Sequence, residues 1–153
     1  MIDLHCHILP GIDDGAASLE DSLAMASLAR RDGIRTIVAT PHRMEGTFTG
    51  AEVAERVSTL QGELERRGLE LELLAGLEVH LTPEVPASVA AGRALTLNGS
   101  RYILVELPLQ RVPPYAEQLL FELQLQGLVP VIAHPERNAE MAANPDLLKR
   151  LVA

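Results

Sequence analysis

Apolar residues gather along the chain in five short runs, and each run is separated from the next by a longer amphipathic stretch. Most of the runs are rich in Val, Ile and Leu without regular alternation, which is typical of parallel strands covered on both faces. Strands are expected at 2–7, 34–40, 71–79, 100–107 and 128–134. The hydrophobic pattern therefore predicts five buried parallel strands.

The amphipathic stretches carry helix signals. Helices are expected at 19–32, between Thr49 and Gly68, between Thr82 and Gly92, from about Tyr115 to Gln126, and from Pro145 onward. Ser18 precedes the first helix as an N-cap, with Asp21 at its third position, and Gly33 follows its end. Thr49 and Glu52 have the spacing of a capping box at the start of the second helix.

Strand and helix signals alternate through the whole chain, which predicts an α/β architecture with right-handed crossovers. Val53, Val57, Leu60 and Leu64 give the second helix one apolar face to lay against such a sheet. With 153 residues, 47% of them hydrophobic, the chain can bury the core of one domain. Either an open doubly wound sheet or a βα barrel satisfies this pattern.

Histidine or glutamate stands at the end of every predicted strand. These residues are His5 and His7, His42, Glu78, Glu106 and His134. The carboxyl ends of parallel strands meet at one edge, where α/β proteins build their sites. His5 and His7 are two residues apart, so both point to the same face of their strand. The strand ends therefore predict one site made of imidazoles and carboxylates.

This combination of side chains is typical of a metal centre. Imidazole and carboxylate ligands suit zinc, manganese or iron, and an unpaired carboxylate inside the apolar run around Glu106 would be costly. Glu78 and Glu106 each have two oxygens and could bridge ions, with Asp13 or Asp14 as a further ligand. These ligands are too many for one tetrahedral ion, which indicates a two- or three-metal site suited to phosphoester hydrolysis.

Several residues near these candidate ligands can be interpreted either as part of the site or as ordinary structural residues. Asp13 and Asp14 lie between glycines, so they could simply form a turn. Arg43 and Arg137 follow candidate ligands and could hold a phosphate by a bidentate fork, or lie at the surface. His80 lies beyond the predicted strand end, and we expect a surface histidine there.

Composition excludes several classes of function. A net charge of −8 disfavours generic binding to nucleic acid or anionic membranes, and the lack of Trp disfavours a stacking platform for single strands. No apolar run reaches the roughly 20 residues that a membrane helix needs, and the N-terminal stretch is unlike a signal peptide. The single cysteine, Cys6, rules out an internal disulfide and should point away from its histidine neighbours into the packing. We therefore expect a cytoplasmic protein.

The motifs "MIDLHCHILPGIDDG", "RTIVATPHR", "GLEVH", "SRYILVELP" and "PVIAHPER" resemble the polymerase-and-histidinol-phosphatase (PHP) superfamily. Within it they are most similar to the bacterial manganese-dependent protein-tyrosine phosphatases of capsular and exopolysaccharide loci. The resemblance implies a distorted (βα)7 barrel of the TIM-like kind with a trinuclear centre, usually assigned manganese, although iron or zinc would also suit the ligands. It implies as substrate the phosphotyrosine tail of the bacterial tyrosine kinase that controls polysaccharide synthesis.

The resemblance also implies residue roles. The implied metal ligands are His5, His7, Asp14, His42, Glu78, Glu106 and His134. Arg137 matches an arginine that binds or polarises the phosphate, and a metal-bound hydroxide takes the place of a cysteine nucleophile. The chain has no CxxxxxR phosphate loop, so Cys6 is not expected to act as the cysteine of classical tyrosine phosphatases does.

The chain departs from this family in one respect. Members of the family carry a late "SDxH" motif that supplies two more ligands, and this chain has no such motif. We expect one PHP-type domain over residues 1–153, truncated at its C-terminus, with about five βα units of an incomplete barrel. Exposed edges at the first and fifth strands would invite self-association. Another PHP-type phosphoesterase, such as a histidinol phosphatase, and an inactive metal-binding fragment are the alternatives.

Overall fold

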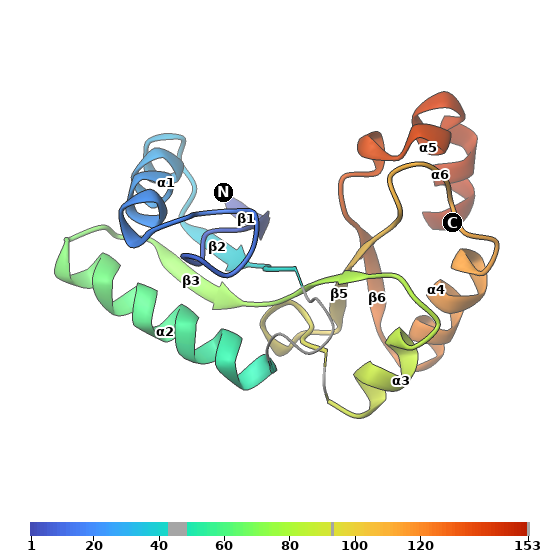
Figure 1. Ribbon diagram of the computed structural model, residues 1–153, viewed down its shortest axis with the longest axis horizontal. Helices are drawn as coiled ribbons and strands as arrows, with labels where there is room; N and C mark the ends of the chain where they lie inside the picture. The colour runs from blue at the N-terminus through green and yellow to red at the C-terminus, as the bar shows by residue number, and fades with distance from the viewer. Residues whose placement is uncertain (43–48, 93, 153) are drawn as a thin grey trace.

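The computed structural model describes residues 1–42, 49–92 and 94–152, so Arg43 lies outside the described residues (Figure 1). The strands are β1 (Ile2–Cys6), β2 (Thr36–Ala39), β3 (Glu72–Ala75), β4 (Glu78–His80), β5 (Tyr102–Glu106) and β6 (Val129–Ile132). The helices are α1 (Leu19–Arg31), α2 (Gly50–Arg66), α3 (Val85–Ala90), α4 (Ala116–Leu125), α5 (Ala139–Ala143) and α6 (Pro145–Val152), with 3₁₀ turns η1 (Leu97–Gly99) and η2 (Pro135–Arg137).

All strand pairs are parallel and form two three-stranded sheets. One sheet has the order β1-β2-β3 and the other has the order β4-β5-β6. Figure 1 shows α1 and α2 beside the first sheet and α3 to α6 beside the second. The predicted α/β architecture with parallel strands is confirmed. β1 and β3 are the edge strands of the first sheet, β4 and β6 are those of the second, and Ile2 and Leu4 of β1 are exposed.

The third predicted strand is wrong as one continuous strand, because the chain breaks at Gly76 and Leu77. Before the break β3 pairs with β2, and after it β4 pairs with β5. A Cβ on Gly76 would lie 2.9 Å from Val38 Cγ1, so only glycine permits this close approach. The sequence gives no sign of the break, because the chain is apolar and largely buried both before and after it. A parallel bridge between His42 and Glu78 links the two sheets at this point.

The cap signals are confirmed where they depend on neighbouring residues. The Ser18 side chain accepts a hydrogen bond from the Asp21 N–H, and Thr49 and Glu52 form a complete capping box. The predicted apolar face of α2 is its buried face, made of Val53, Val57, Leu60 and Leu64. Burying a side chain of this kind stabilises the fold by about 1.5–3 kcal/mol.

Two helices differ from the prediction. α3 begins at Val85 instead of following Thr82 and Pro83 directly, and Pro86 stands in its first turn. α5 was not predicted. Its N-cap, Asn138, accepts a hydrogen bond from the Met141 N–H and donates one to the Pro108 carbonyl. That second bond is a long-range contact, so the helical pattern alone could not indicate it.

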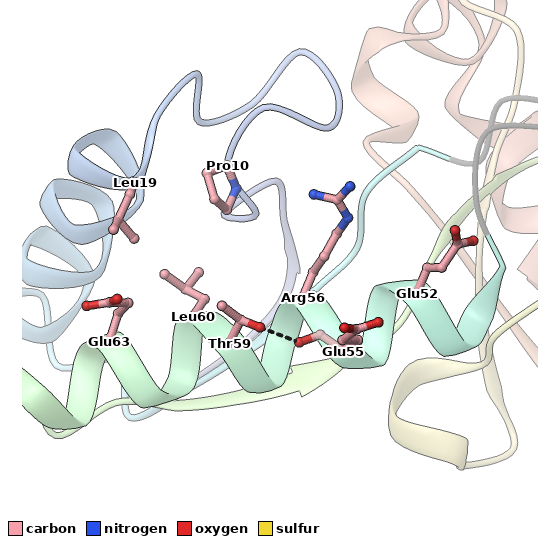
Figure 2. Close-up of a pocket in the computed structure, with 8 residues that line it drawn as sticks. All are labelled: Pro10, Leu19, Glu52, Glu55, Arg56, Thr59, Leu60 and Glu63. Atoms are coloured by element: carbon pink, nitrogen blue, oxygen red, sulfur yellow. Dashed lines mark hydrogen bonds between the residues drawn. The ribbon is translucent and has the colours of Figure 1, made fainter.

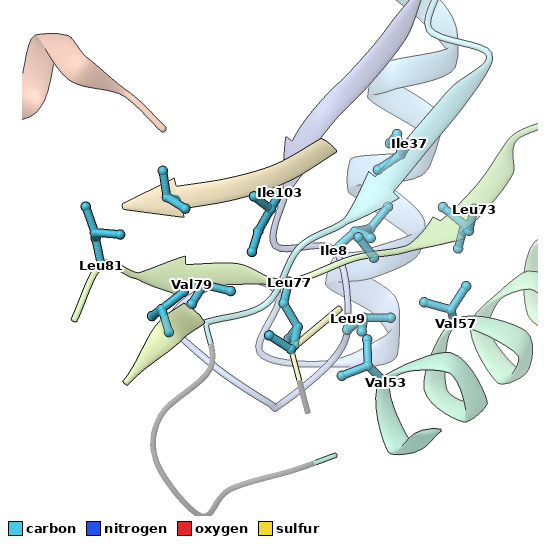
Figure 3. Close-up of a cluster of buried hydrophobic side chains, with 14 of the residues drawn as sticks. Ile8, Leu9, Ile37, Val53, Val57, Leu73, Leu77, Val79, Leu81 and Ile103 are labelled. Carbon is cyan, nitrogen blue, oxygen red and sulfur yellow. The ribbon is translucent and has the colours of Figure 1, made fainter. Parts of the chain in front are cut away.

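The largest buried cluster lies between the sheets and helices. Figure 3 shows Val53 and Val57 of α2 near Leu9 and Leu73, and Ile103 of β5 near Leu77. Leu77 is fully buried directly before Glu78, so the core fixes the position of that glutamate. Among the described residues, none of the helices is long and apolar enough to cross a membrane.

Candidate metal centre

The predicted strand-end residues come together at one edge of the two sheets. We call them the strand-end cluster: His5, His7, His42, Glu78, Glu106 and His134. His7, His42 and His134 follow strands, Glu106 ends β5, and His5 is the second-to-last residue of β1. Glu78 instead opens β4 directly after the break between β3 and β4. The break therefore brings the carboxylate of Glu78 to the edge where the other strands end.

Glu78 is the centre of the cluster. Its side chain is fully buried, and its Oε2 atom lies 3.1 Å from an imidazole nitrogen of each of three residues. These residues are His5, His7 and His42. The other oxygen, Oε1, is 2.8 Å from His134 Nε2. One carboxylate thus contacts four imidazoles from three different strand ends.

The Glu78 contacts fit a bound cation. Among the residues that the structure describes, Glu78 Oε2 is the one buried side-chain oxygen or nitrogen without a hydrogen-bond partner. The Nε2 atoms of His5 and His7 also approach each other to 3.1 Å. Burial would raise the pKa of Glu78, but the imidazoles of His5 and His7 lower it below its usual range. A divalent ion would satisfy both the orphaned carboxylate oxygen and the converging nitrogens.

Three groups of side chains offer ligand atoms within 4.8 Å of one another. The groups are His5, Glu78 and His134; His42, Glu78 and Glu106; and His7, Asp14 and His42. Glu78 belongs to two of the groups, and so does His42. All seven ligands predicted by resemblance therefore lie in at least one group of this kind. Nitrogen and carboxylate donors in this number suit more than one ion.

The two adjacent aspartates have different environments. The Asp14 side chain is 76% exposed, and its Oδ1 atom lies 3.5 Å from His42 Nε2. The Asp13 side chain is only 6% exposed, and it accepts hydrogen bonds from His7 Nδ1, the Gly15 N–H and the His42 N–H. The bond to Gly15 is the turn contact that the sequence indicated. The bonds to His7 and His42 are contacts that sequence reasoning missed.

His134 has an unusual backbone conformation. Its φ angle is +27°, in the left-handed region that side chains rarely adopt, and it precedes Pro135. This conformation accompanies the 2.8 Å contact between its imidazole and Glu78. Strain of this kind is found at functional sites, where the surrounding structure holds a side chain in place.

His80 is exposed, as the sequence predicted, but it belongs to β4 instead of lying past a strand end. Its Nδ1 atom is 3.4 Å from Glu106 Oε2. The side chain of Glu106 is 17% exposed and also lies 3.6 Å from His134 Nε2. His80 is therefore a neighbour of the cluster that the residue pattern had assigned to the general surface.

Cys6 packs against the hydrophobic core, as predicted for a residue that alternates with two histidines. Burial raises the pKa of its thiol to about 12, with further help from Asp3 and Asp13. A thiol with that pKa is protonated at neutral pH and is a poor nucleophile. Arg137 is exposed in η2, three residues after His134.

A separate cavity lies between α2, the loop around Pro10 and the start of α1 (Figure 2). Its volume is about 440 Å³. We call it the α2 groove, and it is lined by Pro10, Leu19, Glu52, Glu55, Arg56, Thr59, Leu60 and Glu63. None of these residues belongs to the strand-end cluster.

Comparison with known families and proteins gives one consistent result. The family model described as "Capsular polysaccharide synthesis, CpsB/CapC" matches residues 1–153. Tyrosine-protein phosphatase YwqE of Bacillus subtilis (strain 168) is 49% identical over 99% of this chain and 61% of the relative. The putative tyrosine-protein phosphatase CapC of Staphylococcus aureus is 35% identical over 99% of this chain and 60% of the relative.

A solved structure is similar over the same region. It is described as belonging to the crystal structures of YwqE from Bacillus subtilis and CpsB from Streptococcus pneumoniae, unique metal-dependent tyrosine phosphatases. The TM-score is 0.96 at 49% identity, covering 99% of this chain and 62% of that chain. The chain therefore spans about three fifths of the length of the proteins it matches.

Proposed function

This chain belongs to the CpsB/CapC family of capsular polysaccharide synthesis proteins, and on that premise we propose that it holds the metal centre of a protein-tyrosine phosphatase. The observation that carries the proposal is the buried carboxylate of Glu78 among four imidazoles, with one oxygen that has no hydrogen-bond partner. Such an arrangement is costly without a cation.

The proposed ligands are His5, His7, Asp14, His42, Glu78, Glu106 and His134. They would hold two or three ions, for which we propose manganese, with iron and zinc as the other metals that suit these ligands. When bound, the ions would supply Lewis-acid polarisation of a phosphate and a water of lowered pKa to attack phosphorus. The lowered pKa of Glu78 keeps its carboxylate ionised and available as a ligand at neutral pH.

Two arginines have proposed roles in binding the phosphate. Arg137 is exposed in the turn that begins directly after His134, and we propose that its guanidinium binds a phosphate at the cluster. Arg43 follows His42 in the sequence and is proposed for the same role from that position. A guanidinium fork matches two phosphate oxygens. The Cys6 thiol is protonated and packed against the core, which favours attack by water over attack by cysteine.

The proposed substrate is phosphotyrosine on a protein, the tail of the tyrosine kinase that regulates capsule or exopolysaccharide synthesis, in the cytoplasm. The names of the relatives support the phosphotyrosine part, since YwqE is called a tyrosine-protein phosphatase and CapC a putative one. The description of the family supports the connection to capsular polysaccharide.

We further propose that residues 1–153 are one PHP-type domain whose two sheets form a single curved array of a TIM-like barrel. The bridge between His42 and Glu78 supports this proposal, because it continues the pairing of β2 from β3 onto β4. If β3 and β4 are counted as one strand position, the five positions run in sequence order, as they do in a βα barrel.

The test is phosphate release by the 153-residue chain loaded with Mn²⁺, measured on a phosphotyrosine peptide, a phosphoserine peptide and histidinol phosphate. We expect release from the phosphotyrosine peptide, loss of release in Glu78→Gln, and unchanged release in Asp32→Asn, which alters an exposed aspartate after α1. Turnover of histidinol phosphate alone would overturn the substrate proposal. Binding of Mn²⁺ without any turnover would indicate a non-catalytic metal-binding chain.

A further inference from the structure

We propose that Asp13 is a positioning residue that presents the Nε2 atom of His7 to the metal ions and ties the end of β2 to the loop after β1. The proposal rests on the metal centre of the proposed function, and it assigns to the buried aspartate a task different from that of its neighbour. Asp14 is mostly exposed and belongs to a ligand group, whereas Asp13 does not.

Asp13 uses both of its oxygens inside the protein. Its Oδ2 atom accepts a hydrogen bond from His7 Nδ1 at 2.7 Å and another from the His42 N–H at 3.0 Å. Its Oδ1 atom accepts a hydrogen bond from the Gly15 N–H at 3.0 Å. All three partners are donors, so only an ionised carboxylate satisfies them together.

The bond to Asp13 determines which nitrogen of His7 is available to a metal. A carboxylate can only accept, so the 2.7 Å contact places a proton on His7 Nδ1. His7 Nε2 points to the other side, 3.1 Å from Glu78 Oε2 and 3.1 Å from His5 Nε2. Histidines that bind metals commonly donate their second N–H to a carboxylate, which fixes the tautomer and the orientation of the ring.

Asp13 also connects two strand ends. His7 follows β1, and the N–H of His42 follows β2. The loop packs closely against His7 at Gly15, where a Cβ would lie only 2.1 Å from the His7 carbonyl oxygen. His7 and His42 are the two imidazoles of the group that contains Asp14. One buried carboxylate therefore holds in place both histidines that this group contributes.

Replacing Asp13 with Asn conserves its shape but removes its ability to accept three bonds. The amide has one accepting oxygen and a donating NH₂ group, so at least one of His7 Nδ1, Gly15 N–H and His42 N–H would face a donor. If the NH₂ group faces His7, the imidazole loses its proton from Nδ1 and carries one on Nε2. A proton on Nε2 would block the nitrogen that the metal needs.

The first experiment is proton–nitrogen NMR of the histidine side chains in the metal-free 153-residue chain. We expect a His7 Nδ1–H signal that is protected from exchange in the wild type and in Asp32→Asn, and that is lost in Asp13→Asn. If the wild type has no protected signal, the proposal is overturned, and this result does not depend on whether the variant folds.

The second experiment is calorimetric titration with Mn²⁺ alone. Because Asp13 acts through His7, we expect Asp13→Asn to weaken Mn²⁺ binding by about 10–100-fold, and Asp32→Asn to bind as the wild type does. Unchanged Mn²⁺ affinity in a folded Asp13→Asn chain would overturn the proposal. If the wild type itself binds no Mn²⁺, the proposed function fails, whereas the NMR signal still decides the role of Asp13.

Discussion

The strand-end cluster and the α2 groove both collect carboxylates, but their surroundings differ. In the groove, Glu52, Glu55 and Glu63 come from one face of one helix. Glu52 accepts the hydrogen bonds of the capping box, Glu63 pairs with Arg66, and Glu55 is exposed to water. In the cluster, Glu78 is fully buried and contacts four imidazoles from three strand ends.

This difference shows that the number of acidic residues in a region does not identify a metal site. A carboxylate that is hydrated or bound to a helix N-terminus is already satisfied and has little need of a cation. A buried carboxylate with an orphaned oxygen is stable only if a cation or several donors compensate it. Burial and the origin of the partners therefore distinguish the two regions, although the groove has a volume of about 440 Å³.

The largest effect is expected from Glu78→Gln. This change removes the negative charge that four imidazoles surround. It also removes a carboxylate that belongs to two of the three ligand groups. Mn²⁺ affinity should fall by more than the roughly 100-fold that changes around a ligand reach, as measured by calorimetry and by metal content after dialysis. The matched change in the groove, Glu55→Gln, should leave Mn²⁺ affinity unchanged. Equal effects of the two variants on Mn²⁺ affinity would show that burial does not distinguish the cluster from the groove.

A smaller loss is expected from Glu106→Gln. Glu106 belongs to one of the three ligand groups, whereas Glu78 belongs to two. We expect metal content per chain to fall, with the remaining ions bound more tightly than in Glu78→Gln. Metal content equal to that of the wild type would remove Glu106 from the ligand set.

The metal-free cluster should make stability depend on pH. The hydrogen bond to Asp13 and the nearby carboxylate of Glu78 raise the pKa of His7 from 6.5 to about 10. A raised pKa contributes stability that is complete below pH 6.5 and is lost as the pH rises toward about 10. The lowered pKa of Glu78 acts in the opposite direction, since its contribution is lost as the pH falls below 4.5.

Thermal unfolding of the metal-free chain should therefore show the highest Tm at mildly acidic pH. Between that range and pH 10 we expect a loss of at least about 1 kcal/mol, equivalent to about 2–4 °C in Tm. Mn²⁺ should raise Tm more at pH 8 than at pH 6, because metal binding displaces protons from histidine. A Tm that is independent of pH above pH 6.5 would contradict this prediction.

The smallest effect is expected from the groove itself. Glu55 is exposed, and the contact drawn for it in Figure 2 is its backbone carbonyl accepting a hydrogen bond from Thr59. Replacing its side chain in Glu55→Gln should change the free energy of unfolding by no more than about 0.5 kcal/mol. Denaturant titration measures this change. A larger loss would show that the groove glutamates support the fold.

The sequence predicted most of the elements because their signals are local. The capping residues Ser18 and Thr49 and the apolar face of α2 depend on residues three or four positions apart, and these predictions are confirmed. The break at Gly76 and the helix capped by Asn138 depend on contacts with Val38 and Pro108, which are distant in the chain. No local pattern contains that information, so these features were missed.

By itself, the sequence determined which residues meet at the candidate site. Parallel strands bring their carboxyl ends to one edge, so histidine and glutamate at five predicted strand ends were enough to indicate a shared cluster. The family resemblance named Asp14 of "GIDDG" as a ligand, but only the tertiary structure decided the role of Asp13. Asp13 faces inward because the N–H groups of Gly15 and His42 and the imidazole of His7 all donate to it, and His42 comes from a different strand end.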